Sequence, residues 1–167
     1  MKKINYFRFI LIAFMIYYYS NFLRYDNYFS FLDYINLCFH EAGHVFLGPF
    51  GETIGFMGGT ISQLFWPSLI TFHFYKTGQV FSSYFCIFWI GENLLNISIY
   101  IGDAIKQELP LVGGGEHDWA YLLEKFKIIQ YTPQISKAVF ISGSLIIFLS
   151  LYLIIKSAFH SKENTHL

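Results

Sequence analysis

Two histidines and a glutamate in the first third of the chain have the types and spacing of a zinc-binding helix. Segment 40–44 is His-Glu-Ala-Gly-His, so His40 and His44 are four residues apart. Residues four apart share one face of an α-helix, and both imidazoles can then reach one Zn²⁺. Glu41, rotated about 100° from His40, lies beside the open coordination position and can accept a proton from the attacking water. The pattern predicts a metallohydrolase with Glu41 as general base. The alternative is structural polar packing, which would need partners because unpaired buried polar groups are costly.

A catalytic zinc normally has three protein ligands plus water, so a third ligand is expected elsewhere in the chain. Asp103 is one candidate, because it follows Glu92 and Asn96 along one face of an apolar segment. The loop 113–119, Gly-Gly-Gly-Glu-His-Asp-Trp, is the other place, since its flexible glycines could bring His117 over a metal. Asp103 and His117 are therefore joint third-ligand candidates, and a carboxylate at the aqueous helix end or a solvated loop histidine is the alternative.

Further polar residues are expected to support the site without binding the metal. They are Glu92, Asn93, Asn96, Tyr100, Glu116 and Asp118. Asn93, Asn96 or Tyr100 could stabilise an oxyanion, although the two amides could equally join helices by hydrogen bonds. Asp118 also has the chemistry and position to cap a helix that begins at Trp119.

The composition indicates an integral membrane protein. Of the 167 residues, 54% are hydrophobic, 22% are aromatic and only 13% are charged, and the mean hydropathy is +0.43. The net charge is zero and no basic cluster exceeds Lys2-Lys3, so neither nucleic acid nor an anionic surface is indicated as a partner. Cys38 and Cys86 are too few and too far apart for a disulfide framework, and both are expected to be buried packing residues.

Uncharged stretches long enough to cross a bilayer predict an all-α bundle of four to five transmembrane helices in a single domain, 1–167. The expected helices are 6–23, 34–48, 60–75, 79–103, 119–129 and 136–156. The first is expected to be an uncleaved anchor rather than a signal peptide, because no small-x-small cleavage site follows it. Segment 119–129 has an amphipathic pattern and is expected to lie in the membrane surface.

Several local features refine this plan. Asp33 is expected to cap the metal-motif helix, and Gly48-Pro49 to end it. Gly58-Gly59 is expected to be a loop, followed by a helix kinked at Pro67. Segment 142–144, Ser-Gly-Ser, should allow close helix packing, and the tail 156–167 is expected to fray. The remaining histidines, His73, His160 and His166, are expected to be interfacial or solvated.

The metal-motif helix can be placed in the membrane in two ways. If it crosses the membrane fully, His40 and His44 lie at the depth of Glu92 and Asn96, far from Asp103. If it only dips in and returns, the two histidines, Asp103 and the His117 loop collect at one membrane face, and the distribution of positive residues slightly favours this arrangement.

The His-Glu-x-x-His pattern on an early membrane helix, with an Asp on a later one, resembles the site-2 protease class of intramembrane zinc metalloproteases. His40, Glu41 and His44 match directly, and segment 93–103 is loosely similar to the family's Asn-x-x-Pro-x-x-Pro-Leu-Asp-Gly signature, without its two prolines and with a longer spacing. The resemblance implies that Asp103 supplies the third ligand. Residues 114–119, Gly-Gly-Glu-His-Asp-Trp, are also similar to an element in a group of small bacterial membrane proteins of undefined function, which implies a shared architecture.

The expected function is hydrolysis of peptide bonds by a membrane-embedded zinc metallopeptidase, with a membrane protein or peptide as substrate. The expected location is a bacterial inner membrane. The alternative is a non-catalytic membrane protein that binds metal as a sensor, transporter or scaffold, with the same histidines and the polar stripe of segment 92–103.

Overall fold

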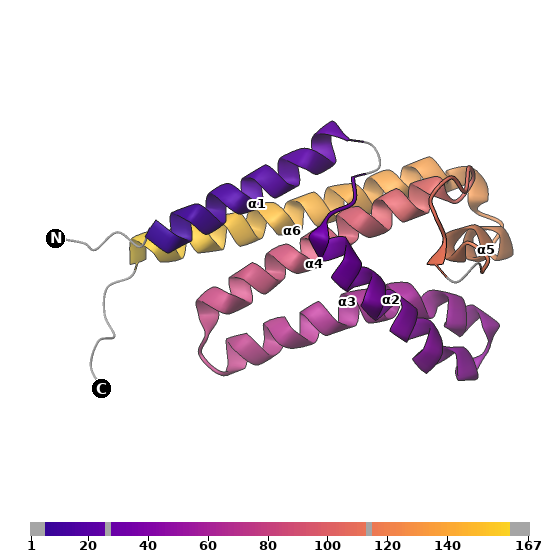
Figure 1. The fold of residues 1–167 in the computed structure, drawn as a ribbon, viewed down its shortest axis with the longest axis horizontal. Coiled ribbons are helices and arrows are strands. Elements are labelled where there is room, and N and C mark those ends of the chain that lie inside the picture. Colours follow the sequence, from indigo (N-terminus) through magenta and orange to yellow (C-terminus); the bar gives the residue numbers. More distant parts are fainter. Residues whose placement is uncertain (1–5, 26–27, 113–114, 161–167) are drawn as a thin grey trace.

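The protein is a bundle of helices, and no strand occurs in the described residues (Figure 1). A computed structural model describes residues 6–25, 28–112 and 115–160. Its α-helices are α1 (Tyr6–Arg24), α2 (Phe31–Leu47), α3 (Glu52–Lys76), α4 (Val80–Asp103), α5 (Asp118–Lys125) and α6 (Thr132–His160). Short 3₁₀ helices lie at Gly48–Phe50 and Ile129–Tyr131. The predicted all-α class is confirmed.

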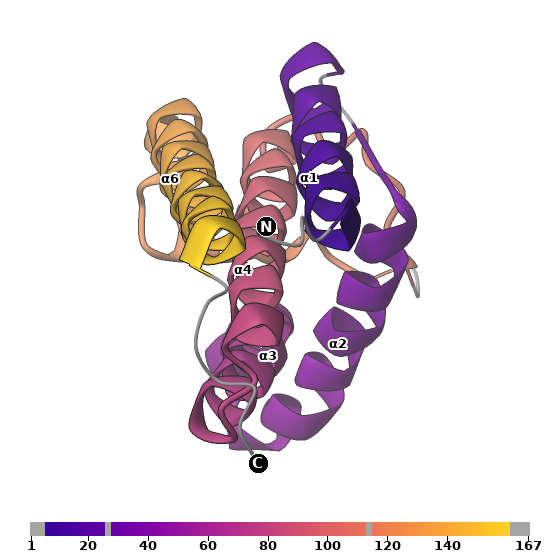
Figure 2. The same cartoon turned by 90° about the vertical axis from the view of Figure 1, so that its left-hand side faces the viewer.

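Three segments are long and apolar enough to cross a membrane: Tyr6–Arg24, Val80–Asp103 and Ile129–Ser157. In the described residues, α2 and α3 do not meet this criterion, so three such helices take the place of the four to five that the sequence predicts. A membrane location is accordingly plausible for this chain. Figures 1 and 2 show α1, α4 and α6 packed together, with α2 and α3 forming a second part of the bundle beside α4.

The long helices pack closely where glycines face each other. A Cβ placed on Gly91 of α4 would lie 2.8 Å from the carbonyl oxygen of Gly143 in α6, and one on Gly143 would lie 2.7 Å from that of Gly91. These distances are below any real contact, so the two backbones touch only because both residues lack a side chain. The close packing predicted around segment 142–144 is confirmed, and α4 and α6 form the most extensive helix pair.

Residues Gly58 and Gly59 lie inside α3, so the prediction of a loop here and a helix from residue 60 is wrong. A Cβ on Gly43 of α2 would lie 2.1 Å from the carbonyl oxygen of Gly58, which shows how closely the two helices cross. The glycines are therefore a contact surface, and the packing gained there offsets their low helix propensity. Pro67 also lies within this helix.

The ends of α2 follow the expected chemistry, but the helix begins three residues earlier than predicted, at Phe31. Asp33 is not the cap but the third residue of the helix, and its carboxylate accepts hydrogen bonds from the backbone N–H and the hydroxyl of Ser30, the true N-cap. At the other end the helix stops at Leu47, before the predicted Gly48-Pro49 pair, and Gly51 makes the turn into α3 with a φ of +116°.

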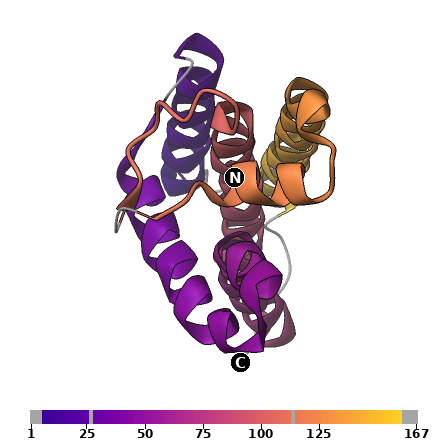
Figure 3. The ribbon, with the colours of Figure 1, turned by 90° about the vertical axis from the view of Figure 1, so that its right-hand side faces the viewer.

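Helix α5 and the segment that precedes it cover the end of the bundle where α4 ends and α3 begins (Figures 1 and 3). The predicted helix 119–129 is shorter than expected and ends at Lys125. Its apolar side packs on protein, because Ala120 and Leu123 form a small core with Ile97 and Ile101 of α4. This placement brings the residues at the start of α5 over α2.

Two further expectations differ from the structure. Cys86 is buried as predicted, but Cys38 is exposed on α2. Helix α6 continues to His160, so the tail is helical over 156–160, beyond the predicted end at 156. Lys2, Lys3, Gly113, Gly114 and the tail 161–167, including His166, lie outside the described residues.

Candidate metal centre

The glycine contact between α2 and α3 determines where the first histidine sits. A Cβ on Gly59 would lie 2.4 Å from Nε2 of His40, so the imidazole occupies the space that any side chain at position 59 would fill. His44 follows one turn later on the same face, and the two ring centroids are 4.8 Å apart. His40 is buried and His44 is half-buried.

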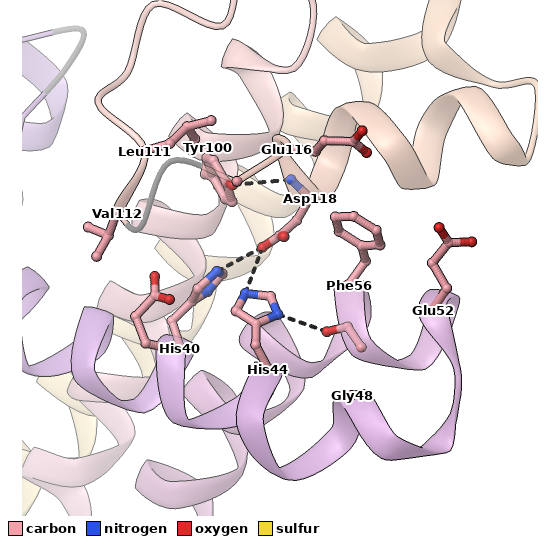
Figure 4. Close-up of a pocket in the computed structure, with 13 residues that line it drawn as sticks. His40, His44, Gly48, Glu52, Phe56, Tyr100, Leu111, Val112, Glu116 and Asp118 are labelled. Carbon is pink, nitrogen blue, oxygen red and sulfur yellow. Dashed lines mark hydrogen bonds and ion pairs between the residues drawn. The ribbon is translucent and has the colours of Figure 1, made fainter.

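The carboxylate that meets this histidine pair belongs to Asp118, the first residue of α5 (Figure 4). Its Oδ2 lies 2.8 Å from Nε2 of His40 and 3.2 Å from Nε2 of His44. The three ligand atoms lie within 4.8 Å of one another and could hold a metal ion. Atoms bonded to a tetrahedral metal at about 2.0–2.1 Å are about 3.3 Å apart, which is close to the two distances from Asp118 to the histidines.

Both imidazoles turn their other nitrogen to a carbonyl oxygen. Nδ1 of His44 lies 2.8 Å from the backbone oxygen of Gly55, and Nδ1 of His40 lies 3.2 Å from Oε1 of Gln63. A carbonyl oxygen can only accept, so each Nδ1 carries a proton and donates it. A neutral ring then presents its Nε2 lone pair to the Asp118 carboxylate, which is repulsive unless a proton or a metal cation lies between them.

A chain of amides sets the orientation of Gln63. Asn96 donates from Nδ2 to Oδ1 of Asp33 at 2.8 Å, and Gln63 donates from Nε2 to Oδ1 of Asn96 at 2.9 Å. Both oxygens of Asp33 face donors, since Oδ2 accepts from Ser30 and Oδ1 from Asn96, so each amide of the chain turns its oxygen toward the next donor. The last oxygen in this Asp33–Asn96–Gln63–His40 chain faces His40, and it therefore selects the Nδ1–H tautomer that leaves Nε2 for a metal.

Aromatic contacts hold Asp118 in place. The backbone N–H of Asp118 donates to the hydroxyl of Tyr100 at 3.2 Å, and the Tyr100 ring stacks on His117 at 4.1 Å between centroids. Farther along α5, Tyr121 stacks on Phe56 of α3 with centroids 3.9 Å apart. These contacts come from α3 and α4, so the carboxylate position depends on the packed bundle.

Asp103 and His117, the two predicted candidates for the third ligand, make other contacts in the structure. Asp103 accepts hydrogen bonds from the backbone N–H groups of Glu108 and Leu109 at 2.9 and 3.0 Å, and its Oδ2 lies 3.5 Å from Nε2 of His117. His117 is the N-cap of α5, because its Nδ1 accepts from the N–H of Ala120 at 3.2 Å. The capping role predicted for Asp118 thus belongs to its neighbour, and Asp118 is the residue that faces the histidines.

The other expected supporting residues divide into two groups. Tyr100, Asn96 and Glu116 lie at or beside the site, and Glu116 is exposed on the cavity wall. Glu92 lies deeper in the bundle, where it accepts hydrogen bonds from Asn36 at 2.8 Å and Tyr18 at 3.4 Å. Asn93 donates to the backbone oxygen of Trp89 in its own helix and makes no contact with the histidines.

The charges around the ligand atoms favour a cation. The hydrogen bond with Asp118 is the main cause that raises the pKa of His44 above its ordinary value. Burial opposes ionisation of Asp118, but its hydrogen bonds with His40 and His44 outweigh burial, and its pKa is lowered. Burial lowers the pKa of His117, so its ring tends to stay neutral beside Asp103. Asp118 is therefore a carboxylate ready to share a cation with the two histidines.

The site opens to solvent through a cavity of about 450 Å³ that is lined by His40, Glu41, His44, Glu52, Glu116 and Asp118, among others. Glu41 is half-buried there, and its carboxylate makes no hydrogen bond or ion pair with the part of the chain that the structure describes. The arrangement can thus offer three ligands for a metal, an uncommitted carboxylate next to them, and room for a small substrate group.

Comparison with known proteins identifies no relative of this chain. It matches no protein-family model, no curated protein and no solved structure. The site itself is therefore the feature of this chain that indicates a function.

Proposed function

We propose that this protein is a membrane-embedded zinc metallopeptidase with His40, His44 and Asp118 as metal ligands and Glu41 as general base. The His-Glu-x-x-His spacing supports this proposal, and so does the uncommitted carboxylate at position 41 on the same cavity. Two nitrogens and one carboxylate oxygen are a common ligand set for catalytic zinc, which keeps a fourth position open.

The observation that carries the proposal is the convergence of three possible ligand atoms, from His40, His44 and Asp118, at one cavity. Both Nδ1 atoms face carbonyl oxygens and both Nε2 atoms face one oxygen of Asp118. An Nδ1–H held by a carbonyl oxygen leaves Nε2 for the position shared with Asp118, and this arrangement is typical of histidines that bind metal through Nε2. In a structural polar cluster, a proton on Nε2 would take the place of the metal. The buried Gln63 and the backbone of Gly55 supply the outer contacts.

Within this proposal each residue has a distinct role. A bound zinc ion would polarise the scissile carbonyl and lower the pKa of the attacking water. Glu41 takes the proton of that water and later transfers it to the leaving amine. Tyr100, whose hydroxyl accepts from the N–H of Asp118, holds the third ligand against the histidines. The hydrogen-bond chain through Gln63 keeps His40 in the tautomer that binds metal.

We place the site near one surface of a bacterial inner membrane, with Tyr6–Arg24, Val80–Asp103 and Ile129–Ser157 as the crossing segments. In this arrangement α2 and α3 are embedded beside them, which would bring the total to four or five membrane elements. Support comes from the contacts of His40 near the end of α4, where its ring centroid lies 5.7 Å from that of Tyr100 and its Nε2 meets Asp118 of α5, as expected for a helix that dips in and returns. The substrate would be a membrane protein or peptide.

The decisive experiment compares wild type with Glu41→Gln after purification and zinc loading. We expect both proteins to bind one equivalent of zinc, and Glu41→Gln to hydrolyse a labelled membrane peptide about 10²–10⁴-fold more slowly, because only the base is removed. Full activity of the variant, or wild-type protein without stoichiometric metal after loading, would refute the proposal. His40→Ala is the matched control that should lose metal as well as turnover.

A non-catalytic metal protein is the second candidate, because buried carboxylates also lie inside the bundle. Asp33 and Glu92 are both buried, and Asp33 is joined to the metal-binding group through amides. Carboxylates inside a membrane bundle are typical of ion pathways. Zinc flux into vesicles that contain the protein, without peptide cleavage, would favour this candidate over the peptidase.

A further inference from the structure

A second cavity of about 500 Å³ adjoins the first one at His40 and Glu41. The two cavities share His40, Glu41, Tyr100, Leu111 and Val112, so one continuous surface passes the metal-binding group. Cavities of this size hold small ligands or a few side chains. A substrate peptide that passes Glu41 would therefore place side chains in both cavities.

The walls of the second cavity are largely apolar. Leu37 of α2, Ile99 of α4 and the segment 109–112 line it, together with Tyr28 and Tyr34. Leu37 precedes Glu41 by one helical turn, so it lies on the same face as the proposed base. An apolar group in this cavity would lie next to the reacting bond.

Three polar side chains of this cavity are already paired with one another, whereas the proposed base Glu41, on the wall shared with the first cavity, has no partner among the described residues. Asp33, Asn96 and Gln63 form the chain of hydrogen bonds that ends at His40, at 2.8, 2.9 and 3.2 Å. A charged or strongly polar substrate group would have to break this chain to gain a partner, at the cost of leaving a buried polar group unpaired. The solvent-facing cavity differs, because Glu52 and Glu116 lie on its wall.

We infer that the cavity formed by Leu37, Ile99 and segment 109–112 binds the large apolar side chain of a peptide residue that flanks the scissile bond. This inference rests on the proposed peptidase function and adds its substrate class: peptides with a bulky aliphatic or aromatic residue at the cleavage point. The occupant is a side chain of an extended peptide, because the cavity joins the metal-binding group and Glu41 along a shared wall.

The test uses peptides that differ at one flanking residue, Ala, Leu or Phe, and two readouts. The first is kcat/KM with zinc-loaded wild type, and the second is equilibrium binding of the same peptides to Glu41→Gln, which needs no turnover. Burial of a Leu or Phe side chain favours the larger peptides over the Ala peptide by about 10–100-fold. We expect this preference in both readouts.

Leu37→Trp should fill the cavity and reduce the preference for the Leu and Phe peptides over the Ala peptide at least tenfold. Leu37→Ala should enlarge the cavity and favour the Phe peptide over the Leu peptide. Val45→Trp is the control, because Val45 is 75% exposed on the same helix and lines neither cavity. The Leu37→Ala variant keeps the test valid if the larger substitution fails to fold.

The outcomes separate the two proposals. Selective binding without cleavage by wild type would refute the peptidase and leave the apolar site in place. Cleavage with equal rates for all three peptides, or selectivity that neither Leu37 variant alters, would overturn the apolar site and leave the peptidase in place. Absence of binding and cleavage for every peptide would overturn both.

Discussion

Replacement of Gly59 by Ala tests whether the α2–α3 crossing positions the metal ligand. The new Cβ would lie 2.4 Å from Nε2, 2.5 Å from Cε1 and 2.7 Å from Cδ2 of His40. Since normal contacts of this kind are about 3.5 Å, the ring must move by about 1 Å. Metal–ligand distances tolerate only about ±0.2 Å, so His40 would no longer reach an ion held by His44 and Asp118.

We expect Gly59→Ala to raise the dissociation constant for zinc by about 100-fold, the upper end of the loss in metal affinity when the contacts that orient a ligand are disturbed. Competition with a chromogenic chelator measures this constant on the folded, monodisperse fraction. Thermal unfolding of the metal-free protein measures the loss of folding stability from overpacking, about 1–3 kcal/mol. This loss can then be distinguished from the loss of His40 as a metal ligand.

Gly48→Ala is the matched control, because a Cβ there would meet nothing within 4 Å. It should retain the wild-type zinc affinity. If Gly59→Ala also retained that affinity, His40 would not be a ligand held in the position that the structure shows, and the reasoning about the metal centre would fail.

Three further predictions concern the same group. Asp118→Asn should weaken zinc binding at least about tenfold more than Asp103→Asn, because Asp118 faces both histidines whereas Asp103 accepts hydrogen bonds from loop N–H groups. Equal losses of zinc affinity in chelator competition would contradict this assignment. Gln63→Leu should raise the zinc dissociation constant about 10–100-fold by removing the acceptor for Nδ1 of His40, and isothermal titration with an unchanged constant would count against the amide chain. The pKa of His44 is raised, so in metal-free protein its contribution to stability is complete below the unfolded pKa and is lost as pH rises through the folded pKa. Zinc occupancy should instead rise over that same pH range, because the ring must lose its proton to bind the metal. Melting curves with and without chelator that respond alike to pH would refute this coupling.

Uncharged stretches of the sequence are enough to predict most of the bundle. The bounds of α1 and α4 differ from the predicted ones by one residue, because long uncharged stretches between charged ends leave few alternatives in a membrane. The error at Gly58 and Gly59 has a different cause. Low helix propensity predicts a break, but a glycine that faces another helix gains close packing, and no local pattern shows that a partner is present.

The histidine pair could be predicted from the sequence because both proposed ligands lie on one helix, where spacing determines geometry. The proposed third ligand lies 74 residues beyond His44 in the chain, and its identity depends on how α5 is rotated about its own axis. Successive residues at a helix start point about 100° apart, so either His117 or Asp118 could face the metal site. The contact of Phe56 with Tyr121 selects the rotation that turns Asp118 inward.

The amides of the apolar segment show why a structural role and a functional role need not be alternatives. Asn96 joins three helices, since it donates to Asp33 of α2 and accepts from Gln63 of α3 while itself belonging to α4. The same two hydrogen bonds fix the oxygen that faces Nδ1 of His40. A substitution of Asn96 that loosens this helix contact also removes the constraint on which nitrogen of His40 carries the proton. The stability of the bundle and its metal affinity should therefore change together at Asn96.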